Sequence, residues 1–373
     1  MKKIIFIQPY LAPYRIDVYN NLAKTFDMKL LFWYEEAPEH KFDLNILKSK
    51  CDFKYEYLSK GFVAFNRVFK FDIFWHIVSF RPHLVICHEF GFFTMVSLVL
   101  SKFINLKVII NTDDNIESFM RIAGIRKMTS KLCLTNANGV TTVNPITLNY
   151  IINLFPHLKE NSFCYPILQD EVVLKDELKS SIDISNRNIS FYNLLGKKIL
   201  LFIGRLSDVK GIDVLLKSYK EIVKSQTDIL LIIVGSGPEE KKLKEIVDCY
   251  NLKNNIIFTG RLDGVELYSW YNVGQIFILP SRFEPFGAVV NEALIAGNYV
   301  IVSDAVGSKF LLNEDNGLIF PNEDYEQLSH QLKIMIDKIS PIDKRINIKD
   351  SLSVHSFDVF TNQFKEFLLK QSS

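Results

Sequence analysis

Residues 276–293 read IFILPSRFEPFGAVVNEA, and this stretch is the strongest indication of the fold class. Its first four residues are apolar and predict a buried strand that ends at Pro280. A loop with proline and glycine follows, and we expect a helix to begin near Gly287. A strand that runs through a short loop into a helix is the repeating step of α/β proteins with parallel sheets.

The same step repeats along the chain on both sides of this stretch. Short apolar runs alternate with longer segments of helical period, and the runs lack the polar alternation of a half-exposed sheet. We therefore expect an α/β protein with two parallel-sheet domains. The expected strands lie at residues 4–7, 30–33, 84–87, 108–110 and 140–143 in the first domain and at 199–203, 229–234, 256–258, 276–279 and 300–302 in the second.

Length and composition agree with two globular domains. The 373 residues exceed one ordinary core, and 48% apolar with 23% charged residues excludes a disordered chain or a membrane-spanning bundle. A polar stretch without a clear apolar period precedes the second strand set, and Phe357, Phe360, Phe364 and Leu368 recur at helical spacing near the end. We expect a first domain at residues 1–170, a linker at 171–195, a second domain at 196–345 and a C-terminal helical segment at 346–373.

Net charge narrows the function class. The formal charge is +2, which argues against a protein that coats nucleic acid. Residues 1–169 hold 20 Lys and Arg against 14 Asp and Glu, a net +6 that leaves −4 for the remainder. This asymmetry is either chance or the mark of a first half that faces an anionic partner.

Cysteine usage and hydropathy indicate the compartment. Five widely spaced cysteines without a CxxC pair predict neither a disulfide framework nor a zinc site, so we expect a reducing compartment, the cytoplasm. The first apolar run is too short for a signal peptide. The most hydrophobic run, residues 90–100, is about 11 residues long, whereas a helix that spans a bilayer needs roughly 20. We therefore expect no transmembrane segment.

Two carboxylates in the opening stretch carry the first chemical prediction. Glu284 precedes the expected helix and Glu292 lies inside it, so both can point into one crevice beyond the strand end. Carboxylates accept hydrogen bonds from the hydroxyls of polyols such as ribose and hexose. The amides of Phe286, Gly287 and Ala288 lie at a helix N-terminus, which favours an anion.

Two glycine-bearing turns follow earlier strands of the same set. In Gly204-Arg205-Leu206-Ser207-Asp208-Val209-Lys210-Gly211, the two cations can converge on a diphosphate, although surface cations on such a loop are equally ordinary. The turn Val234-Gly235-Ser236-Gly237-Pro238 either faces a phosphate or is a plain turn capped by Ser236. Because Glu240 occupies the last glycine position of GxGxxG, a nicotinamide site is not supported.

Together these motifs resemble family 4 of the retaining nucleotide-sugar glycosyltransferases. That family is marked by a Glu, seven residues and a second Glu, here Glu284 and Glu292, and the cationic loop, the glycine turn and Phe258-Thr259-Gly260 stand in the family's order. The resemblance covers about residues 198–320. It implies the GT-B fold: two Rossmann-like domains facing a cleft, the first for the acceptor and the second for the donor, with the C-terminal helix crossing back to the first.

The resemblance also implies roles for single residues. Arg205 and Lys210 hold the donor diphosphate, Glu292 binds ribose hydroxyls and Glu284 lies against the transferred sugar. The remaining donor contacts implied by the resemblance are at Gly204, Gly235, Arg261, Leu262, Phe286, Gly287, Ala288 and Val289.

The resemblance further implies catalysis without a metal or cofactor. No Asp-x-Asp occurs in the chain, so Arg205 and Lys210 are expected to stabilise the charge that develops on the leaving diphosphate. Retention follows either from leaving-phosphate assistance on one face of the sugar or from a double displacement through a protein carboxylate.

The chain departs from the family's pattern at three places. Gln8-Pro9-Tyr10 stands where relatives often carry paired glycines, and only Gly307 remains of two glycines after the strand at 300–302. The usual histidine of the first domain is absent, and Asp114 stands in its place, so we count Asp114 among the catalytic candidates with Glu284, Arg205 and Lys210.

Candidates for the acceptor side follow strands of the first half. Asp113 and Asp114 come directly after a strand and face the ligand edge, unless Asp114 or Asn115 caps the next helix. His88 shares that edge, or is a polar core residue. Arg15 follows Pro13 at a helix start and either meets an acceptor phosphate or is solvated.

Residues 60–82 combine aromatic and basic side chains. Phe62, Phe65, Phe69, Phe71, Phe74, Trp75 and Phe80 lie among Lys60, Arg67, Lys70 and Arg81. This pattern indicates either peripheral contact with an anionic membrane, on its inner face, or core packing.

We therefore expect a glycosyltransferase that moves a hexose-type unit from a nucleotide diphosphate sugar to a saccharide acceptor, lipid-linked, in surface-polysaccharide assembly, without a nucleic-acid partner. Two other classes stay open. One is a nucleotide-sugar epimerase, and the other is a non-catalytic sugar-nucleotide-binding subunit.

Overall fold

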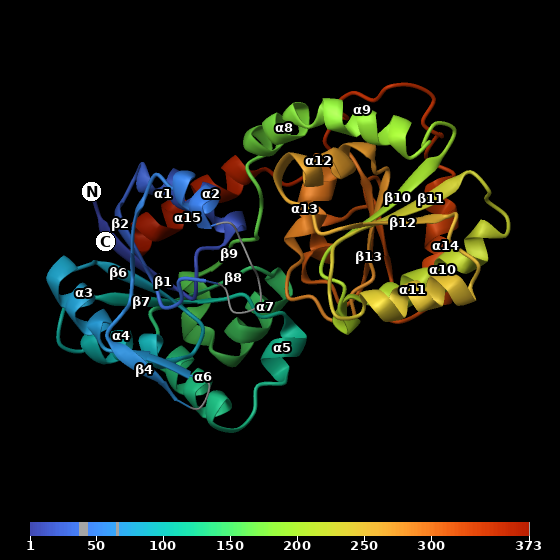
Figure 1. Ribbon diagram of the computed structural model, residues 1–373. Coiled ribbons are helices and arrows are strands. Elements are labelled where there is room, and N and C mark those ends of the chain that lie inside the picture. Colours follow the sequence, from blue (N-terminus) through green and yellow to red (C-terminus); the bar gives the residue numbers. More distant parts are fainter. Residues whose placement is uncertain (37–43, 65–66, 373) are drawn as a thin grey trace. The chain divides into compact units, whose positions relative to one another are not determined.

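The computed structural model describes residues 1–36, 44–64 and 67–372, and the chain divides into two compact units (Figure 1). Unit 1 comprises Met1–Ile167 together with Phe357–Ser373, and unit 2 comprises Leu168–Ser356. The C-terminal helix therefore belongs to the unit that begins the chain.

Unit 1 is built on a seven-stranded sheet in the order β3-β2-β1-β6-β7-β8-β9, in which every neighbouring pair is parallel. The central strands are continuous apolar runs buried on both faces, which is why they carry no alternating pattern. The strands are β1 (Lys3–Gln8), β2 (Asp27–Phe32), β3 (Lys54–Tyr57), β6 (Leu84–His88), β7 (Lys107–Thr112), β8 (Gly139–Thr142) and β9 (Ser162–Cys164).

Helices and one hairpin complete unit 1. The hairpin pairs β4 (Gly61–Ala64) with β5 (Arg67–Lys70) antiparallel, outside the main sheet. The helices are η1 (Pro13–Arg15), α1 (Ile16–Ala23), α2 (Leu44–Ser49), α3 (Asp72–Phe80), α4 (Phe92–Leu100), α5 (Ile116–Met120), α6 (Gly124–Asn136), α7 (Pro145–Leu154), η2 (Pro156–Asn161) and α15 (Phe357–Gln371).

The C-terminal helix α15 is held on unit 1 by stacked aromatic rings. The ring of Phe364 lies 4.5 Å from that of Tyr165 and 5.6 Å from that of Phe163, and the Phe367 ring lies 5.4 Å from Phe163. The Tyr165 hydroxyl also hydrogen-bonds Thr361 at 2.9 Å. These contacts join the last helix to β9 and the residue after it.

Unit 2 is built on a six-stranded parallel sheet in the order β12-β11-β10-β13-β14-β15. In Figure 1, α10, α11 and α14 cover one face, while α8, α9, α12 and α13 gather on the other. The strands are β10 (Lys198–Ile203), β11 (Ile229–Val234), β12 (Ile256–Gly260), β13 (Ile276–Leu279), β14 (Tyr299–Ser303) and β15 (Gly317–Phe320). The helices are α8 (Glu171–Ser180), α9 (Ile182–Phe191), η3 (Asp208–Lys210), α10 (Ile212–Val223), α11 (Glu240–Cys249), α12 (Gly264–Val273), α13 (Ala288–Ile295), η4 (Gly307–Leu311) and α14 (Tyr325–Ile336).

Strand order defines a ligand edge in each unit. In both sheets the chain adds strands outward from the first one and then returns to its other side, so the order reverses between β1 and β6 and between β10 and β13. Loops diverge at such a reversal and leave a crevice outside the carboxyl ends of the strands. The loops after β1, β6, β10 and β13 are therefore where a ligand site is expected.

All ten strands predicted from apolar runs are present, and the α/β class with two parallel sheets is confirmed. The edge strands β3, β9 and β15 were not predicted, because they are short and partly exposed. The helix expected near Gly287 begins at Ala288, with Gly287 as its N-cap.

The linker expected over residues 171–195 is wrong, because that segment forms α8 and α9 and belongs to unit 2. Its helical stripe was hidden because two of the buried positions are serines. Ser181 and Ser185 are fully buried, and the amide of Asn272 on α12 donates to both hydroxyls, at 2.9 and 3.1 Å. The expected segment 346–373 also divides, since residues up to Ser356 belong to unit 2.

Candidate functional site

The loops that follow β10, β11 and β13 are interlocked at the ligand edge of unit 2. A Cβ at Gly235 would lie 1.9 Å from the carbonyl oxygen of Gly204, and one at Gly211 would lie 2.1 Å from that of Pro280. Gly211 also has a φ of 62°, a conformation that side chains rarely adopt. Glycine is therefore required at these positions, because the backbones of successive loops touch.

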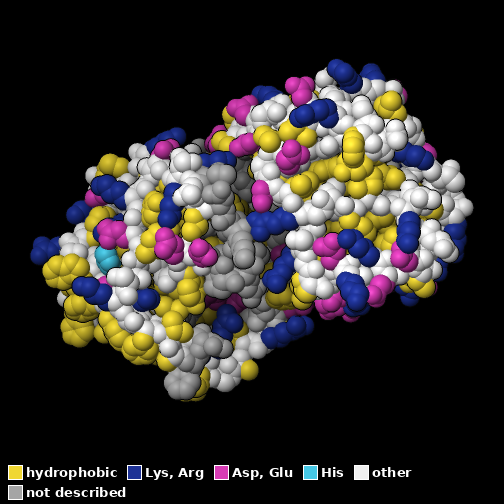
Figure 2. Space-filling model, in the orientation of Figure 1, with side chains coloured by type: hydrophobic (Ala, Val, Ile, Leu, Met, Phe, Trp, Pro, Cys, Tyr) yellow, Lys and Arg dark blue, Asp and Glu magenta, His cyan; other side chains and the backbone are white. Residues whose placement is uncertain are grey.

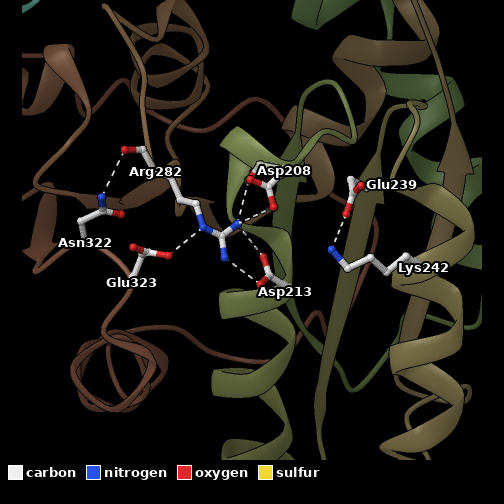
Figure 3. Close-up of polar contacts among 7 residues, drawn as sticks. All are labelled: Asp208, Asp213, Glu239, Lys242, Arg282, Asn322 and Glu323. Atoms are coloured by element: carbon white, nitrogen blue, oxygen red, sulfur yellow. Dashed lines mark hydrogen bonds and ion pairs between the residues drawn. The ribbon is translucent and has the colours of Figure 1, made fainter. Parts of the chain in front are cut away.

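Arg282 ties the loop after β13 to the loop after β10 (Figure 3). Its backbone N–H donates to the Val209 carbonyl at 2.8 Å, and its guanidinium donates to the Asp208 carbonyl at 2.7 Å. The same guanidinium holds both carboxylate oxygens of Asp213, at 2.9 and 2.7 Å, and donates to Glu323 at 2.9 Å. Hydrogen bonding to Asp213 raises the pKa of Arg282, so this cation is permanently charged. No sequence pattern around Arg282 predicts this role.

Lys210 and Glu284, expected on the donor side, are in direct contact. The Lys210 ammonium donates to a carboxylate oxygen of Glu284, and their side chains are only 21% and 14% exposed. Glu284 is itself fixed from behind, since its carbonyl accepts the Gly307 N–H at 2.9 Å. The pair joins the two loops that border the strand-order reversal.

The N-terminus of α13 opens beside this pair. Gly287 adopts a φ of 89° at the N-cap, and no side chain caps the helix there. The first amides of a helix, here at Ala288 and Val289, have no acceptor within the helix and carry a partial positive charge. Phe286, by contrast, is 3% exposed, so its ring belongs to the core and only its backbone faces the loop.

Glu292 lies one turn inside α13 and is paired with a tyrosine. The hydroxyl of the fully buried Tyr271 on α12 donates to Glu292 Oε2 at 2.7 Å. Burial raises the pKa of Glu292, and the bond from Tyr271 acts against that rise. One carboxylate oxygen is thereby oriented, and no contact in the described structure joins Glu292 to Lys210 or Glu284.

The remaining donor-side candidates lie at the rim. Arg205 is exposed, and its guanidinium has no hydrogen-bond acceptor among the described residues. Arg261, after β12, is also exposed and donates to Asp263 at 3.2 Å, while Leu262 is half-buried.

Arg15 and Asp113, both expected on the acceptor side, are bonded to each other. One nitrogen of the buried Arg15 guanidinium lies 2.5 and 2.6 Å from the two Asp113 oxygens, and the Asn111 amide donates to the same carboxylate at 3.1 Å. Although burial opposes ionisation, the Arg15 guanidinium holds the pKa of Asp113 below its usual range. The ion pair joins the loop after β1 to the end of β7, and neither group projects alone toward solvent.

Asp114 belongs to a second cluster on the same edge. Arg126 on α6 donates to Asp114 and to Glu89, each at 3.1 Å, and Thr112 donates to the other Glu89 oxygen at 2.9 Å. Burial and the nearby Glu89 carboxylate raise the pKa of Asp114 to about 6. The next helix is capped by the Asn115 side chain, and the Asp114 carboxylate does not serve as its N-cap. Arg126 was not predicted, because nothing in α6 marks it.

The loop after β6 is conformationally strained at this edge. Glu89 has a φ of 61°, which is uncommon for a residue other than glycine, asparagine or aspartate. Such strain persists only where surrounding contacts enforce it, and it is concentrated at functional sites. The preceding residue, His88, has a buried Nδ1 without a hydrogen-bond partner in the described structure, and burial lowers its pKa.

The aromatic residues of 60–82 divide between core and surface. Phe62, Phe71, Phe74 and Trp75 are each more than half exposed, and Figure 2 shows hydrophobic side chains gathered over α3 and β4. Phe69 and Phe80 are partly buried, and Phe65 lies outside the described residues. Exposed rings in such a group are unusual for a surface that meets only water.

The described residues contain neither a cluster of metal ligands nor a membrane-spanning helix. No group of three or more His, Cys, Asp or Glu side chains is placed to hold a metal ion in the part of the chain that the structure describes. Within the same ranges, no helix has both the length and the hydrophobicity needed to cross a bilayer.

Comparison with known proteins identifies the class of domain in unit 2. Residues 186–348 match the family model of glycosyl transferases group 1, so this stretch carries a domain of that type. A GDP-mannose-dependent alpha-mannosyltransferase of Corynebacterium glutamicum is 37% identical over 132 residues, which are 35% of this chain and 29% of that protein. A 2-deoxystreptamine N-acetyl-D-glucosaminyltransferase of Niallia circulans is 33% identical over 132 residues, 35% of this chain and 34% of the relative. The match thus spans about a third of each relative's length.

Similarity in structure extends over the whole chain. HepE of Anabaena, solved in complex with UDP, superimposes with a TM-score of 0.76 over 99% of this chain and 100% of its own, at 15% identity. Identity this low shows the fold alone. The fold is GT-B, as the sequence resemblance implied.

Proposed function

We propose that the chain is a retaining glycosyltransferase of family 4, which transfers a hexose-type unit from a nucleotide diphosphate sugar to a saccharide acceptor. The observation that carries the proposal is the contact between Lys210 and Glu284 beside the open N-terminus of α13. An ammonium, unpaired helix amides and a carboxylate stand together there at a strand-order reversal. Diphosphate and sugar hydroxyls are the groups that these three features bind.

In this proposal the donor diphosphate lies between Lys210, Arg205 and the first amides of α13. Bound phosphate oxygens draw the Lys210 ammonium away from Glu284, whose carboxylate then accepts hydrogen bonds from the sugar. Arg205 is exposed at the loop after β10, so it can close on the phosphate without breaking an ion pair. Gly204 and Gly235 keep both turns narrow enough for the backbone to approach the phosphates.

The nucleoside end of the donor is assigned to the other side of α13. Glu292, oriented by Tyr271, accepts from the ribose hydroxyls, and its oxygen Oε1 is the one that Tyr271 leaves available. The loop of Arg261 and Leu262 meets the base. The relatives named above include one dependent on GDP-mannose and one structure with UDP, so both bases are candidates for this chain.

Transfer in this proposal needs no metal. The bond between the anomeric carbon and the diphosphate oxygen breaks, and negative charge develops on the leaving group. Lys210, Arg205 and the α13 amides stabilise that charge, which lowers the barrier without a Lewis acid. The acceptor hydroxyl bonds to the anomeric carbon on the same face, and its proton passes to a leaving-phosphate oxygen, which gives retention.

Unit 1 is assigned to the acceptor, which we infer to be a lipid-linked saccharide of surface-polysaccharide assembly. Asp114 has a carboxylate with a pKa of about 6, and in its ionised form it accepts hydrogen bonds from hydroxyls of the reacting sugar. The exposed rings of residues 60–82, flanked by Lys60, Lys70 and Arg81, would enter the headgroup region of an anionic membrane on its cytoplasmic face.

Product analysis tests the proposal. The purified chain is incubated with UDP-, GDP- and ADP-hexoses, with and without a lipid-linked saccharide, and products are separated by mass spectrometry and NMR. The expected result is acceptor-dependent release of nucleoside diphosphate and a product of retained anomeric configuration. Conversion of the sugar nucleotide without any acceptor would instead indicate an epimerase, and stable binding without turnover would indicate a non-catalytic subunit.

A further inference from the structure

A cavity of about 520 Å³ lies at the strand-order reversal of unit 1 and is formed by unit 1 residues alone. It opens outside the carboxyl ends of β1, β2 and β6, and is closed by β5, the start of α4 and α6. Its volume is within the range of small-molecule sites. Only His88, of the residues predicted for the acceptor, lines it.

One wall of the cavity is a continuous set of aromatic rings. Trp33 stacks on Phe93 with ring centroids 4.7 Å apart and planes 20° from parallel. Phe92 stands edge-on to Phe93 at 5.6 Å, and Phe69 stands edge-on to Phe92 at 5.2 Å. A wall of this kind binds hydrocarbon or the apolar face of a sugar ring, and gives little hydrogen bonding.

The same rings continue from the cavity to the exposed surface. Phe71, which is 54% exposed, stands edge-on to Phe92 at 5.5 Å, and the 55% exposed Phe62 stacks on Phe69 at 5.4 Å. The exposed rings of Phe62 and Phe71 therefore continue the cavity wall through Phe69 and Phe92. A molecule with a long apolar part can lie along these rings, with one end in the cavity and the other end outside the protein.

The polar groups of the cavity gather at its other side. Arg126 is neutralised by Glu89 and Asp114, whereas the exposed Arg67 has no ion-pair partner among the described residues. The buried Nδ1 of His88 is likewise without a partner in the described structure. A ligand here therefore meets one uncompensated positive charge, at Arg67, next to apolar rings.

We propose that this cavity binds the lipid part and the adjoining phosphate of an amphipathic acceptor, a lipid-linked saccharide phosphate. Its hydrocarbon chain lies against Trp33, Phe92 and Phe93, its phosphate pairs with Arg67, and its first sugar reaches His88. The inference rests on the proposed function, which it deepens by naming the acceptor's chemical class and the residues that select it.

Tryptophan fluorescence tests this inference directly, with dodecyl phosphate below its micellar concentration as the probe. The chain has three tryptophans: Trp33 in the wall, Trp75 on the surface and Trp270 buried in unit 2. In a Trp75→Phe background, Trp33 is the one that dodecyl phosphate can reach. We expect a saturable change in emission with dodecyl phosphate and none with inorganic phosphate.

Two variants locate the probe. Gly91 lines the cavity, and a Cβ there meets no atom within 4 Å, so Gly91→Phe places a ring in the cavity without a backbone clash. It should weaken dodecyl phosphate binding by about tenfold or more. Arg67→Gln should weaken it about tenfold, the loss of one charge-assisted contact, while binding of neutral dodecyl maltoside stays the same. Arg121→Gln, on an exposed arginine outside the cavity, is the matched control.

These experiments distinguish a failure of the cavity inference from a failure of the proposed function. Absence of a saturable Trp33 response, or equal affinity in the parent, Gly91→Phe and Arg67→Gln proteins with unchanged melting temperatures, would overturn the inference. If Gly91→Phe itself melts early, Arg67→Gln and the maltoside comparison still decide it. A protein that binds dodecyl phosphate through these residues but transfers no sugar supports the cavity and contradicts only the proposed function.

Discussion

Arg282 and Asp213 face each other in a two-bonded ion pair that joins the loop after β13 to the first turn of α10. The N–H groups of a guanidinium match the two oxygens of a carboxylate, and the same group reaches the Asp208 carbonyl and Glu323 (Figure 3). Lys210 lies on the loop after β10 and Glu284 on the loop after β13, so the contacts of Arg282 hold together the two loops that carry this pair.

Arg282→Lys should reduce transfer far more than it reduces stability. An ammonium cannot make the fork of bonds to Asp213 and still reach Asp208 and Glu323. We expect kcat to fall by about ten- to a hundredfold, because Lys210 and Glu284 lose their relative position. Arg187→Lys, on the exposed face of α9, should leave kcat unchanged. A wild-type kcat in Arg282→Lys would show that the ion pair serves stability alone.

The acid limb of the pH–rate profile should move when Arg126 is replaced. Burial and Glu89 raise the pKa of Asp114 to about 6, while the Arg126 charge acts to lower it. Activity that needs ionised Asp114 therefore declines as pH falls through about 6, and in Arg126→Gln the decline should begin at higher pH. Arg121→Gln is the control, and a coincident limb in all three proteins would remove Asp114 from the mechanism.

Through Asp114, a fall in pH should stabilise the folded chain although it lowers the activity. A carboxyl whose pKa is higher in the folded than in the unfolded chain favours folding when protonated. Its stabilising contribution is therefore complete below the unfolded value and is lost as pH rises through about 6. Asp114→Asn should remove this part of the pH dependence of Tm between pH 4 and 7.

Transfer should persist after metal removal. If Lys210, Arg205 and the α13 amides neutralise the leaving diphosphate, EDTA should leave the rate within about twofold, and added Mg²⁺ should not restore the Lys210→Ala variant. Loss of activity in EDTA that Mg²⁺ or Mn²⁺ reverses would contradict this assignment.

Membrane contact should depend on the exposed rings of α3. Phe74→Ser with Trp75→Ser removes two side chains that are 54% and 69% exposed, and should weaken co-sedimentation with phosphatidylglycerol vesicles by about tenfold or more. Phe191→Ser replaces a ring that is 77% exposed on α9 of unit 2 and should change nothing. Equal losses in both proteins would point to non-specific hydrophobic adhesion.

Much of the fold was predictable because buried parallel strands leave continuous apolar runs in the sequence. The helices α8 and α9 were not predicted for a physical reason. Two positions on their buried face are the serines Ser181 and Ser185, which hydrogen-bond Asn272, so the hydrophobic period of that face is interrupted. The edge strand β3 alternates exposed with half-buried positions and lacks an apolar run.

Site residues were predictable only where the sequence of a single loop indicates their role. The sequence placed Lys210 and Glu284 on the donor side, but their mutual contact, across 74 positions, depends on β10 and β13 being neighbours. Arg15 and Asp113 were both assigned to the acceptor, yet they neutralise each other across 98 positions. Arg126 and Arg282 act through groups brought together by the tertiary structure, so no local pattern marks them.

Binding of a nucleotide diphosphate sugar to unit 2 through Lys210 is the step on which the proposed transfer depends. Calorimetric titration of UDP-, GDP- and ADP-hexoses into the wild-type chain and into Lys210→Ala, with Glu284→Ala and Glu292→Ala alongside, tests it most directly. We predict one-to-one binding of at least one donor, weakened about tenfold or more in Lys210→Ala with unchanged Tm. Failure of every donor to bind the wild type, or wild-type affinity in Lys210→Ala, would contradict it.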